Sequence, residues 1–152
     1  MPSVIPAQRH HAPAIALLLE EMDRFYGTTE FEPIEQRVRQ IEEQLFSDQP
    51  AAHTLLAAEQ DDVIGVAAYS FLWPAVGITR SLYLKELYVS KEYRRSGVGQ
   101  LLMQRLVEVA TETGCSRIEW TTDVDNTDAQ QFYETLGYSP HRGKLFYRSE
   151  LG

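Results

Sequence analysis

The sequence predicts an α/β sandwich, in which a mixed, mostly antiparallel sheet of about six to seven strands is flanked by about four helices. Two apolar, β-compatible runs, at residues 53–59 and 63–73, are separated by three polar residues, which is typical of an antiparallel hairpin. Later strands alternate with helical patterns instead. Hairpins followed by strands that are joined through helices favour a mixed sheet covered by helices.

The first half of the chain also carries two amphipathic helical patterns. Ahead of them, Val4 and Ile5 predict a short opening strand. The first helix is expected to begin near Pro13 and end at Gly27, and its apolar stripe consists of Ile15, Leu18, Leu19, Met22 and Phe25. The second is expected to begin near Pro33 with a buried face of Ile34, Val38, Ile41 and Leu45. Its outer face is expected to consist of Glu35, Arg37, Gln40 and Glu43.

The stretch from residue 84 to residue 102 joins a buried strand to a helix. Residues 84–89 are strand-like, and the apolar residues that follow have helical spacing: Val98, Leu101, Leu102, Leu106 and Val109. The turn between them, RRSGVG at residues 94–99, places arginines and glycines where the first N–H groups of the helix have no acceptor. These N–H groups, the helix dipole and the guanidinium charge favour a phosphate or diphosphate there. The same residues also suit a simple tight turn.

The remaining elements follow from the same patterns. Strict alternation along the strand before the turn predicts that one face carries Leu82, Leu84, Glu86 and Tyr88. Residues 117–122 predict the next strand, residues 123–126 a polar loop, and the stretch up to Gly137 a helix. Residues 144–148 predict a terminal strand.

Two motifs lie in the second half of the chain. The turn reads Arg94-x-x-Gly97-x-Gly99, and the later helix region carries Asn126, Ala129, Phe132, Tyr133, Gly137 and Tyr138. The first resembles the acetyl-coenzyme A signature of the GNAT superfamily of N-acetyltransferases, Arg/Gln-x-x-Gly-x-Gly/Ala, and the second resembles the downstream motif of that superfamily. Together they look most like the diamine and polyamine N-acetyltransferase branch. The common pattern has Gly directly after the first Arg, where this chain has Arg95.

The resemblance implies that acetyl-CoA is the co-substrate. In this superfamily the strand before the turn and the next strand splay apart, and the pantetheine arm of the cofactor enters the gap. The residues implied in cofactor binding are Leu87, Tyr88, Val89, Arg94, Arg95, Ser96, Gly97, Val98, Gly99, Gln100, Asn126 and Ala129. Asn126 is also expected to cap the helix that follows it.

Acetyl transfer from a thioester to an amine needs a neutral amine, a stabilised carbonyl oxygen and a proton for the leaving thiolate. Since a free primary amine has a pKa of about 10.4, Glu86 is expected to take its proton directly or through water. The alternatives for this carboxylate are an arginine partner or binding of a cationic substrate. The resemblance implies that the Tyr133 hydroxyl protonates the sulfur, against the alternative of a core tyrosine. The oxyanion donor is expected to be a backbone N–H at Leu87 or Tyr88, freed by a β-bulge there.

Length and composition narrow the class of protein. A chain of 152 residues with 43% hydrophobic content is expected to form one domain, residues 1–152. The net charge of -8 argues against nucleic acid as a partner, because phosphate backbones need clustered Lys and Arg. The absence of a long apolar stretch and the single Cys115 predict a cytoplasmic protein with no membrane contact. The four histidines, His10, His11, His53 and His141, lack metal-ligand spacing, so no metal is expected.

The leading hypothesis is an enzyme that moves an acetyl group from acetyl-CoA to a primary amine of a small molecule, by direct attack in a ternary complex. A diamine- or polyamine-like acceptor leads, while an aminoglycoside-like antibiotic, an amino acid or a protein N-terminus stays open. A hypothesis from another class is an acyl-CoA-binding regulatory module with little turnover, against which the presence of Tyr133 argues. The resemblance also implies a homodimer, with the terminal strand as a candidate interface element.

Overall fold

The computed structural model describes residues 1–152, which form two compact units, Met1–Trp120 and Thr121–Gly152. Each unit is described by itself. No helix in either unit combines the length and the apolar character needed to cross a membrane.

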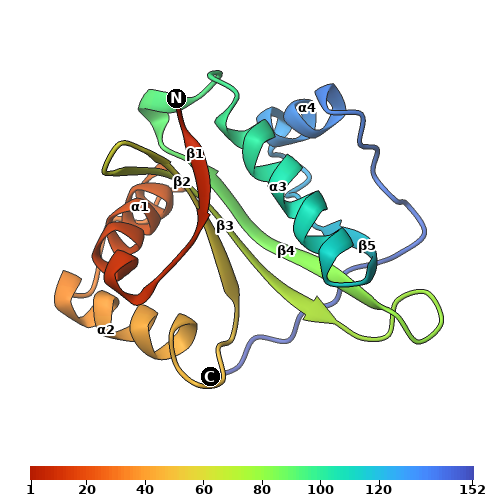
Figure 1. Ribbon diagram of the computed structural model, residues 1–152, viewed down its shortest axis with the longest axis horizontal. Helices are drawn as coiled ribbons and strands as arrows, with labels where there is room; N and C mark the ends of the chain where they lie inside the picture. Colours follow the sequence, from red (N-terminus) through yellow and green to blue (C-terminus); the bar gives the residue numbers. More distant parts are fainter. The chain divides into compact units, whose positions relative to one another are not determined.

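The first unit is built on one five-stranded sheet with the order β1-β2-β3-β4-β5. The strands β1 to β4 pair with one another in antiparallel fashion, and β5 runs parallel to β4. The strands are β1 (Ser3–Pro6), β2 (His53–Glu59), β3 (Asp62–Leu72), β4 (Arg80–Val89) and β5 (Cys115–Trp120). This order confirms the mixed, mostly antiparallel sheet and the hairpin between β2 and β3 (Figure 1).

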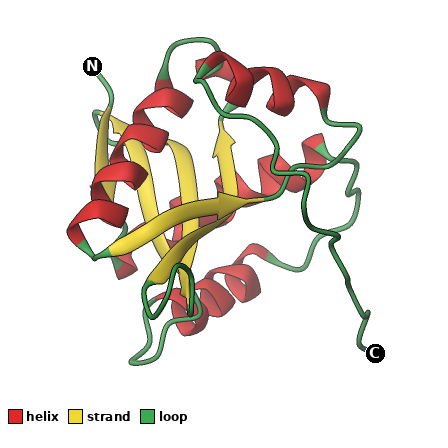
Figure 2. Ribbon diagram, turned by 90° about the vertical axis from the view of Figure 1, so that its right-hand side faces the viewer, coloured by secondary structure: helices red, strands yellow, loops and turns green.

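Helices cover both faces of the sheet, as Figures 1 and 2 show. On one face lie α1 (Ala12–Phe25) and α2 (Ile34–Leu45), and α1 builds a core cluster with the sheet through Ile15, Leu18, Met22, Leu56, Val66 and Tyr88. On the other face lies α3 (Val98–Glu112), which comes so close to β3 that a Cβ on Gly65 would lie 3.2 Å from Leu102 and 3.3 Å from Val98. The predicted α/β sandwich is confirmed.

The second helix differs from its prediction at Arg37. The sequence pattern places this residue on the solvent face, but its side chain is only 16% exposed. Its guanidinium lies 3.2 Å from the carboxylate of Asp23 and 3.3 Å from that of Glu32. The prediction is wrong here because acids from α1 and from the loop before α2 give a charged side chain partners that its own helix does not supply.

The second unit contains one helix, α4 (Thr127–Thr135). Asn126 caps it as predicted, since its Oδ1 accepts a hydrogen bond of 3.1 Å from the N–H of Ala129. The helix region closes at Gly137, whose φ of 92° is the left-handed conformation that glycine adopts readily. The predicted terminal strand at residues 144–148 is wrong, because a strand exists only where another strand pairs with it and none does here. The sheet therefore has five strands rather than about six to seven.

A β-bulge in β4 changes which side chains share a face. Ala68 of β3 pairs with Glu86, whereas the next residue, Tyr69, pairs with Leu84. Lys85 is therefore an extra residue in β4. Because side chains alternate across a strand, the extra residue turns Leu84 and Glu86 to opposite faces of the sheet. The prediction that these four residues share one face is wrong for this reason. Leu82 and Leu84 lie on one face of the sheet, and Glu86 and Tyr88 lie on the other.

Candidate active site

The turn between β4 and α3 has the geometry of an anion-binding helix start. Gly97 is the residue before the helix and has a φ of 86°, which a side chain strains. No heavy atom lies within 4 Å of the place where its Cβ would be, so the space above the turn is open. The N–H groups of residues 98–100 have no acceptor within the helix. Val98 as a whole residue is 1% exposed, so its side chain is not available to a ligand.

Arg95, where the sequence departs from the common pattern, also lies in the left-handed region. Its φ is 63°, a value that costs a residue with a Cβ about 1–2 kcal/mol. Glycine adopts this conformation without that cost, which gives a physical reason for the glycine of the common pattern. Arg95 thus adopts a conformation that favours glycine, and it adds a second exposed guanidinium next to Arg94 in the chain.

Arg94 is held at the start of the turn by α1 and by β4. Its guanidinium carbon lies 4.3 Å from the centre of the Phe25 ring and 5.2 Å from that of Tyr88. Its Nε donates a hydrogen bond of 3.2 Å to the carbonyl oxygen of Val89. The residue remains exposed, so the charge is oriented by its neighbours and still accessible to an anion.

A half-buried carboxylate, Glu21 of α1, lies beneath the same region. It accepts hydrogen bonds from the Tyr88 hydroxyl at 2.6 Å, from the Ser90 hydroxyl at 3.1 Å and from the Lys91 N–H at 3.1 Å. Burial acts to raise the pKa of Glu21, but these hydrogen bonds and the charge of Arg94 outweigh it, so the pKa is lowered. Burial and the contact with Glu21 raise the pKa of Tyr88 to about 12.

The C-terminal half of β4 has an open edge. The pairing with β5 ends where Leu84 meets Trp120, so no strand of the sheet pairs with the outer side of residues 85–89. Consecutive residues of a strand direct their N–H groups to opposite sides, so one of Leu87 and Tyr88 presents its N–H to this edge. The predicted bulge at these two residues is wrong: both are in register with β3, and the bulge is at Lys85.

The bulge at Lys85 decides where Glu86 lies. Glu86 is half-buried and shares the α1 face of the sheet with Tyr88, whose ring belongs to the core cluster of that face. Tyr88 as a whole residue is 4% exposed and its hydroxyl bonds to Glu21, so its side chain is not available to a cofactor. Glu86 is therefore the acidic side chain that β4 itself presents toward the α1 layer.

The second unit carries the other predicted site residues on α4. Asn126 and Ala129 form the cap of the helix. Tyr133 lies about two helical turns after Asn126 and about one turn after Ala129. The rings of Phe132 and Tyr133 meet edge to face, with their centres 5.1 Å apart. Tyr133 also supplies a carbonyl oxygen that accepts the N–H of Tyr138 at 3.0 Å. The end of α4 is thus tied to the residues that follow Gly137.

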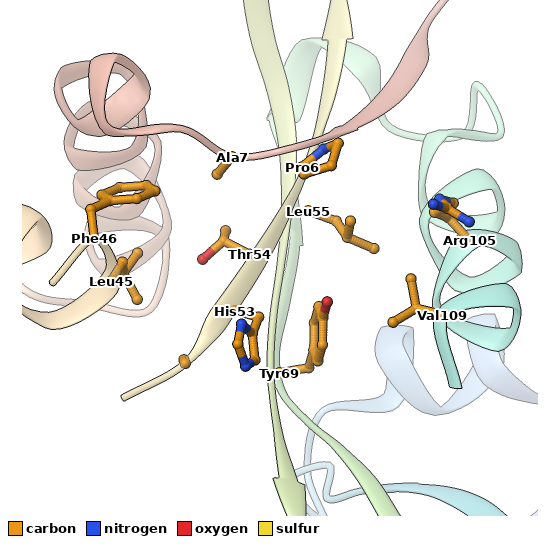
Figure 3. Close-up of a pocket in the computed structure, with 11 residues that line it drawn as sticks. Pro6, Ala7, Leu45, Phe46, His53, Thr54, Leu55, Tyr69, Arg105 and Val109 are labelled. Carbon is orange, nitrogen blue, oxygen red and sulfur yellow. The ribbon is translucent and has the colours of Figure 1, made fainter. Parts of the chain in front are cut away.

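A pocket of about 290 Å³ opens at the start of β2. Figure 3 shows Phe46 on one side of the strands, Arg105 and Val109 on the other, and His53 and Tyr69 near the middle. None of the predicted catalytic or cofactor residues lines it. It lies toward the end of the sheet where His53 pairs with Tyr69, whereas Val89, which leads into the turn at residues 94–100, pairs with Gly65.

Comparison with known proteins decides the family. Residues 15–138 match the family model described as Acetyltransferase (GNAT) family. The chain belongs to the GNAT family of acetyltransferases. It is an acetyl-CoA-dependent N-acetyltransferase, in keeping with the names of its relatives.

Its GNAT relatives include thialysine N-epsilon-acetyltransferase of Sus scrofa, which is 30% identical over 71% of this chain and 70% of the relative. Aminoglycoside N(6')-acetyltransferase type 1 of Serratia marcescens is 33% identical over 46% of this chain and 48% of the relative. Among solved structures, an integron cassette protein from the mobile metagenome of V. cholerae superposes with a TM-score of 0.91 at 30% identity, covering 98% of this chain and 92% of that one. An aminoglycoside N-acetyltransferase in complex with CoA, at 21% identity and a TM-score of 0.78 over 99% and 96% of the two chains, shows the shared fold alone.

The sequence does not identify Glu21 and Phe25 as neighbours of the turn at residues 94–100. The sequence pattern places Phe25 in the apolar stripe of α1, and nothing near Glu21 in the sequence indicates its contacts. The hydrogen-bond partners of Glu21 are 67 to 70 residues away in the chain. The helical spacing of α1 gives the only indication in the sequence that Glu21 is partly buried. It places Glu21 next to Leu18 and Met22, on the side of α1 that meets the sheet.

Proposed function

We propose that this GNAT enzyme transfers the acetyl group of acetyl-CoA to a primary amine of a small molecule by direct attack in a ternary complex. The observation that carries the proposal is the turn at residues 94–100, where an open helix start meets two exposed arginines. Its charge and its N–H groups suit the diphosphate of acetyl-CoA. A diamine or polyamine-like acceptor leads, supported by the thialysine acetyltransferase relatives.

The cofactor would bind along the open edge of β4 and over the turn. One backbone N–H of Leu87 or Tyr88 would hold the carbonyl oxygen as charge develops on it, with Val89 continuing the contact toward the turn. The diphosphate would meet Arg94, Arg95, Ser96, Gly97 and the backbone of Val98, Gly99 and Gln100. Asn126 and Ala129 are also proposed to contact the cofactor, as the family motif implies.

Glu86 is proposed to receive the proton of the attacking amine, directly or through water. Its place on the α1 face of β4 supports this, because the resemblance to the GNAT superfamily implies that the loop after α1 lines the acceptor site. A role in binding a cationic acceptor is the alternative. Glu86→Gln should lower kcat about 10²-fold or more if the carboxylate takes the proton, and should raise the KM of the amine at nearly constant kcat if it only binds it.

Tyr133 is proposed to protonate the sulfur of coenzyme A as the thiolate leaves. Its position on α4 between the capped start and Gly137 matches the family motif. A phenol holds its proton at neutral pH and can donate it. Residues 1–152 would then act as one catalytic domain, and the family model supports this because its match, residues 15–138, includes parts of both units.

The acceptor is tested by a panel of amines with purified protein and acetyl-CoA, read as release of free thiol. The panel holds thialysine, lysine, a diamine, a polyamine, an aminoglycoside and a short peptide. The proposal expects the highest kcat/KM for thialysine, the diamine or the polyamine. A preference for the aminoglycoside would favour the second candidate, which the Serratia relative supports. No turnover of any amine, together with no binding of coenzyme A, would contradict the proposal.

We also propose a cytoplasmic homodimer. The single cysteine is a free thiol, as expected in a reducing compartment. The segment at residues 144–148 leaves Leu145, Phe146 and Tyr147 between 63% and 83% exposed, which suits an interface with a second copy. Sedimentation equilibrium should give about twice the 17.4 kDa of one chain at micromolar concentration. A single species at the mass of one chain would contradict the dimer.

A further inference from the structure

Glu21 is joined to one short segment of chain by all three of its hydrogen bonds. The donors are the Tyr88 hydroxyl, the Ser90 hydroxyl and the Lys91 N–H, at 2.6, 3.1 and 3.1 Å. This segment is the place where β4 ends and the chain turns toward the cofactor turn. A carboxylate that accepts three hydrogen bonds from one segment fixes both the position and the direction of that segment.

The hydrogen bonds of the next residues carry this placement into the turn. Lys91–Tyr93 form a single 3-10 turn, in which the N–H of Tyr93 donates to the carbonyl oxygen of Ser90 at 2.9 Å. The Ser96 hydroxyl then donates to the carbonyl oxygen of Tyr93. Each link begins at a residue that the previous link holds, and the series ends one residue before Gly97. A shift at Ser90 would therefore move the turn.

Glu21 also acts on Arg94 through charge. The guanidinium of Arg94 lies over the Tyr88 ring, whose hydroxyl is bonded to Glu21, and the charge of Arg94 acts on the carboxyl of Glu21. The second ring beside Arg94 is Phe25, four residues after Glu21 on the same helix. One side of α1 thus holds the backbone before the turn through Glu21 and the first arginine of the turn through Phe25.

We propose that Glu21 is a positioning residue for the cofactor turn. It holds the end of β4 so that Arg94 and the N–H groups at the start of α3 meet the diphosphate of coenzyme A together. The inference rests on the proposed function, because it takes the turn as the diphosphate site. A purely structural role, in which Glu21 only anchors α1 to the sheet, is the alternative that the experiment must separate.

The test compares two acetyl donors in Glu21→Gln. One is acetyl-CoA, and the other is S-acetylpantetheine, which has the same thioester and arm but lacks the diphosphate. The loss of charged hydrogen bonds that hold the turn should raise the KM for acetyl-CoA about tenfold. The kcat at saturation, the KM of the amine and the kcat/KM for S-acetylpantetheine should stay within about twofold. Glu20→Gln is the matched control, because this neighbouring acid pairs only with exposed Arg24 on its own helix, and it should change none of these values.

The possible outcomes separate the two roles. An equal loss with both donors would mean that Glu21 supports the fold generally, and it would overturn the proposal, as would an unchanged KM for acetyl-CoA. If Glu21→Gln does not fold, Ser90→Ala removes one of the three hydrogen bonds to Glu21 instead. This variant should raise the KM for acetyl-CoA about threefold and leave the kcat/KM for S-acetylpantetheine unchanged. An unchanged KM for acetyl-CoA, or an equal loss with both acetyl donors, would overturn the proposal for this variant too. Failure of the unmutated protein to bind coenzyme A would instead contradict the proposed function.

Discussion

The guanidinium carbon of Arg94 lies 4.3 Å from the centre of the Phe25 ring, so the last residue of α1 covers the first arginine of the turn between β4 and α3. Phe25 is 53% exposed and closes no part of the core. Its ring is better explained by this contact, since an aromatic face beside a cation restricts the rotamers of a long side chain and attracts its charge. The contact links the helix that precedes the α1–α2 loop to the turn that is proposed to bind the cofactor.

Replacement of Arg94 should weaken the binding of acetyl-CoA more than replacement of Phe25. Arg94→Ala removes a charged contact to the diphosphate and should raise the KM for acetyl-CoA about tenfold. Phe25→Leu keeps the apolar bulk but removes the aromatic face, and a loss of about 0.5–1 kcal/mol corresponds to a two- to fivefold rise. Both values come from steady-state kinetics at saturating amine. An unchanged KM for acetyl-CoA in Arg94→Ala would contradict a contact between Arg94 and the diphosphate.

Gly97→Val should raise the Kd of coenzyme A sharply. The residue has a φ of 86°, so any side chain adds strain of about 1–2 kcal/mol and enters the open space above the turn. Isothermal titration measures the effect. Gly77→Val is the matched control, because Gly77 also has a positive φ, 59°, with no atom within 4 Å of its Cβ position, but lies in the loop between β3 and β4. Equal affinity of the two variants would contradict the assignment of the turn.

Arg95→Gly should make the protein more stable. Relief of the left-handed strain at a φ of 63° outweighs the added chain entropy of glycine, and the net gain should be about 0.5–1 kcal/mol in the free energy of unfolding. Urea titration of the protein without ligand measures it. The Kd of coenzyme A decides the second role of this residue: a rise of about threefold or more supports a contact with phosphate, and an unchanged Kd restricts Arg95 to the shape of the turn.

Tyr133→Phe should leave the fold and the Kd of coenzyme A intact while turnover falls. The change removes one hydroxyl and keeps the ring that meets Phe132. General-acid assistance is worth about 10²- to 10⁴-fold, so the loss should appear in kcat with little change in either KM. Tyr147→Phe, at an 83% exposed residue of the same unit, is the control and should be neutral. A fall of less than about threefold in kcat would pass the role of acid to water or another side chain.

Tyr88 should give the protein a stability that is lost in alkali. Burial, and then the contact with the Glu21 carboxylate, raise the pKa of Tyr88 to about 12, above its value of about 10 in the unfolded chain. The neutral phenol is therefore favoured by folding, and this contribution is complete below pH 10 and lost as the pH rises through 12. Urea unfolding at pH 8, 10 and 11 should show a smaller decline for Tyr88→Phe than for the unmutated protein. Equal slopes would mean that the phenol titrates normally.

Local patterns in the sequence determined most of the elements and both motifs. The hydrophobic periods of α1, α2 and α3, the runs of β2 and β3 and the Asn126 cap depend on neighbours within a few residues, and all are present. The Gly97 turn was also evident, because a positive φ and a helix start are properties of the local chain. The resemblance to the GNAT superfamily rests on the same local residues, because the motif at residues 94–99 is contiguous, and the match to the family model confirms the family.

Tertiary structure alone decided the surroundings of the site. Strict alternation assigned Glu86 the same face as Leu84, but the extra residue Lys85 is set by pairing with β3 and turns Glu86 toward α1. The hydrogen bonds of Glu21, the ion pair between Arg37 and Asp23 and the covering of Arg94 by Phe25 join residues that lie on different elements. Periodicity reports which side of an element is buried but not what buries it, because register and contact partners are fixed only when separate elements pack together.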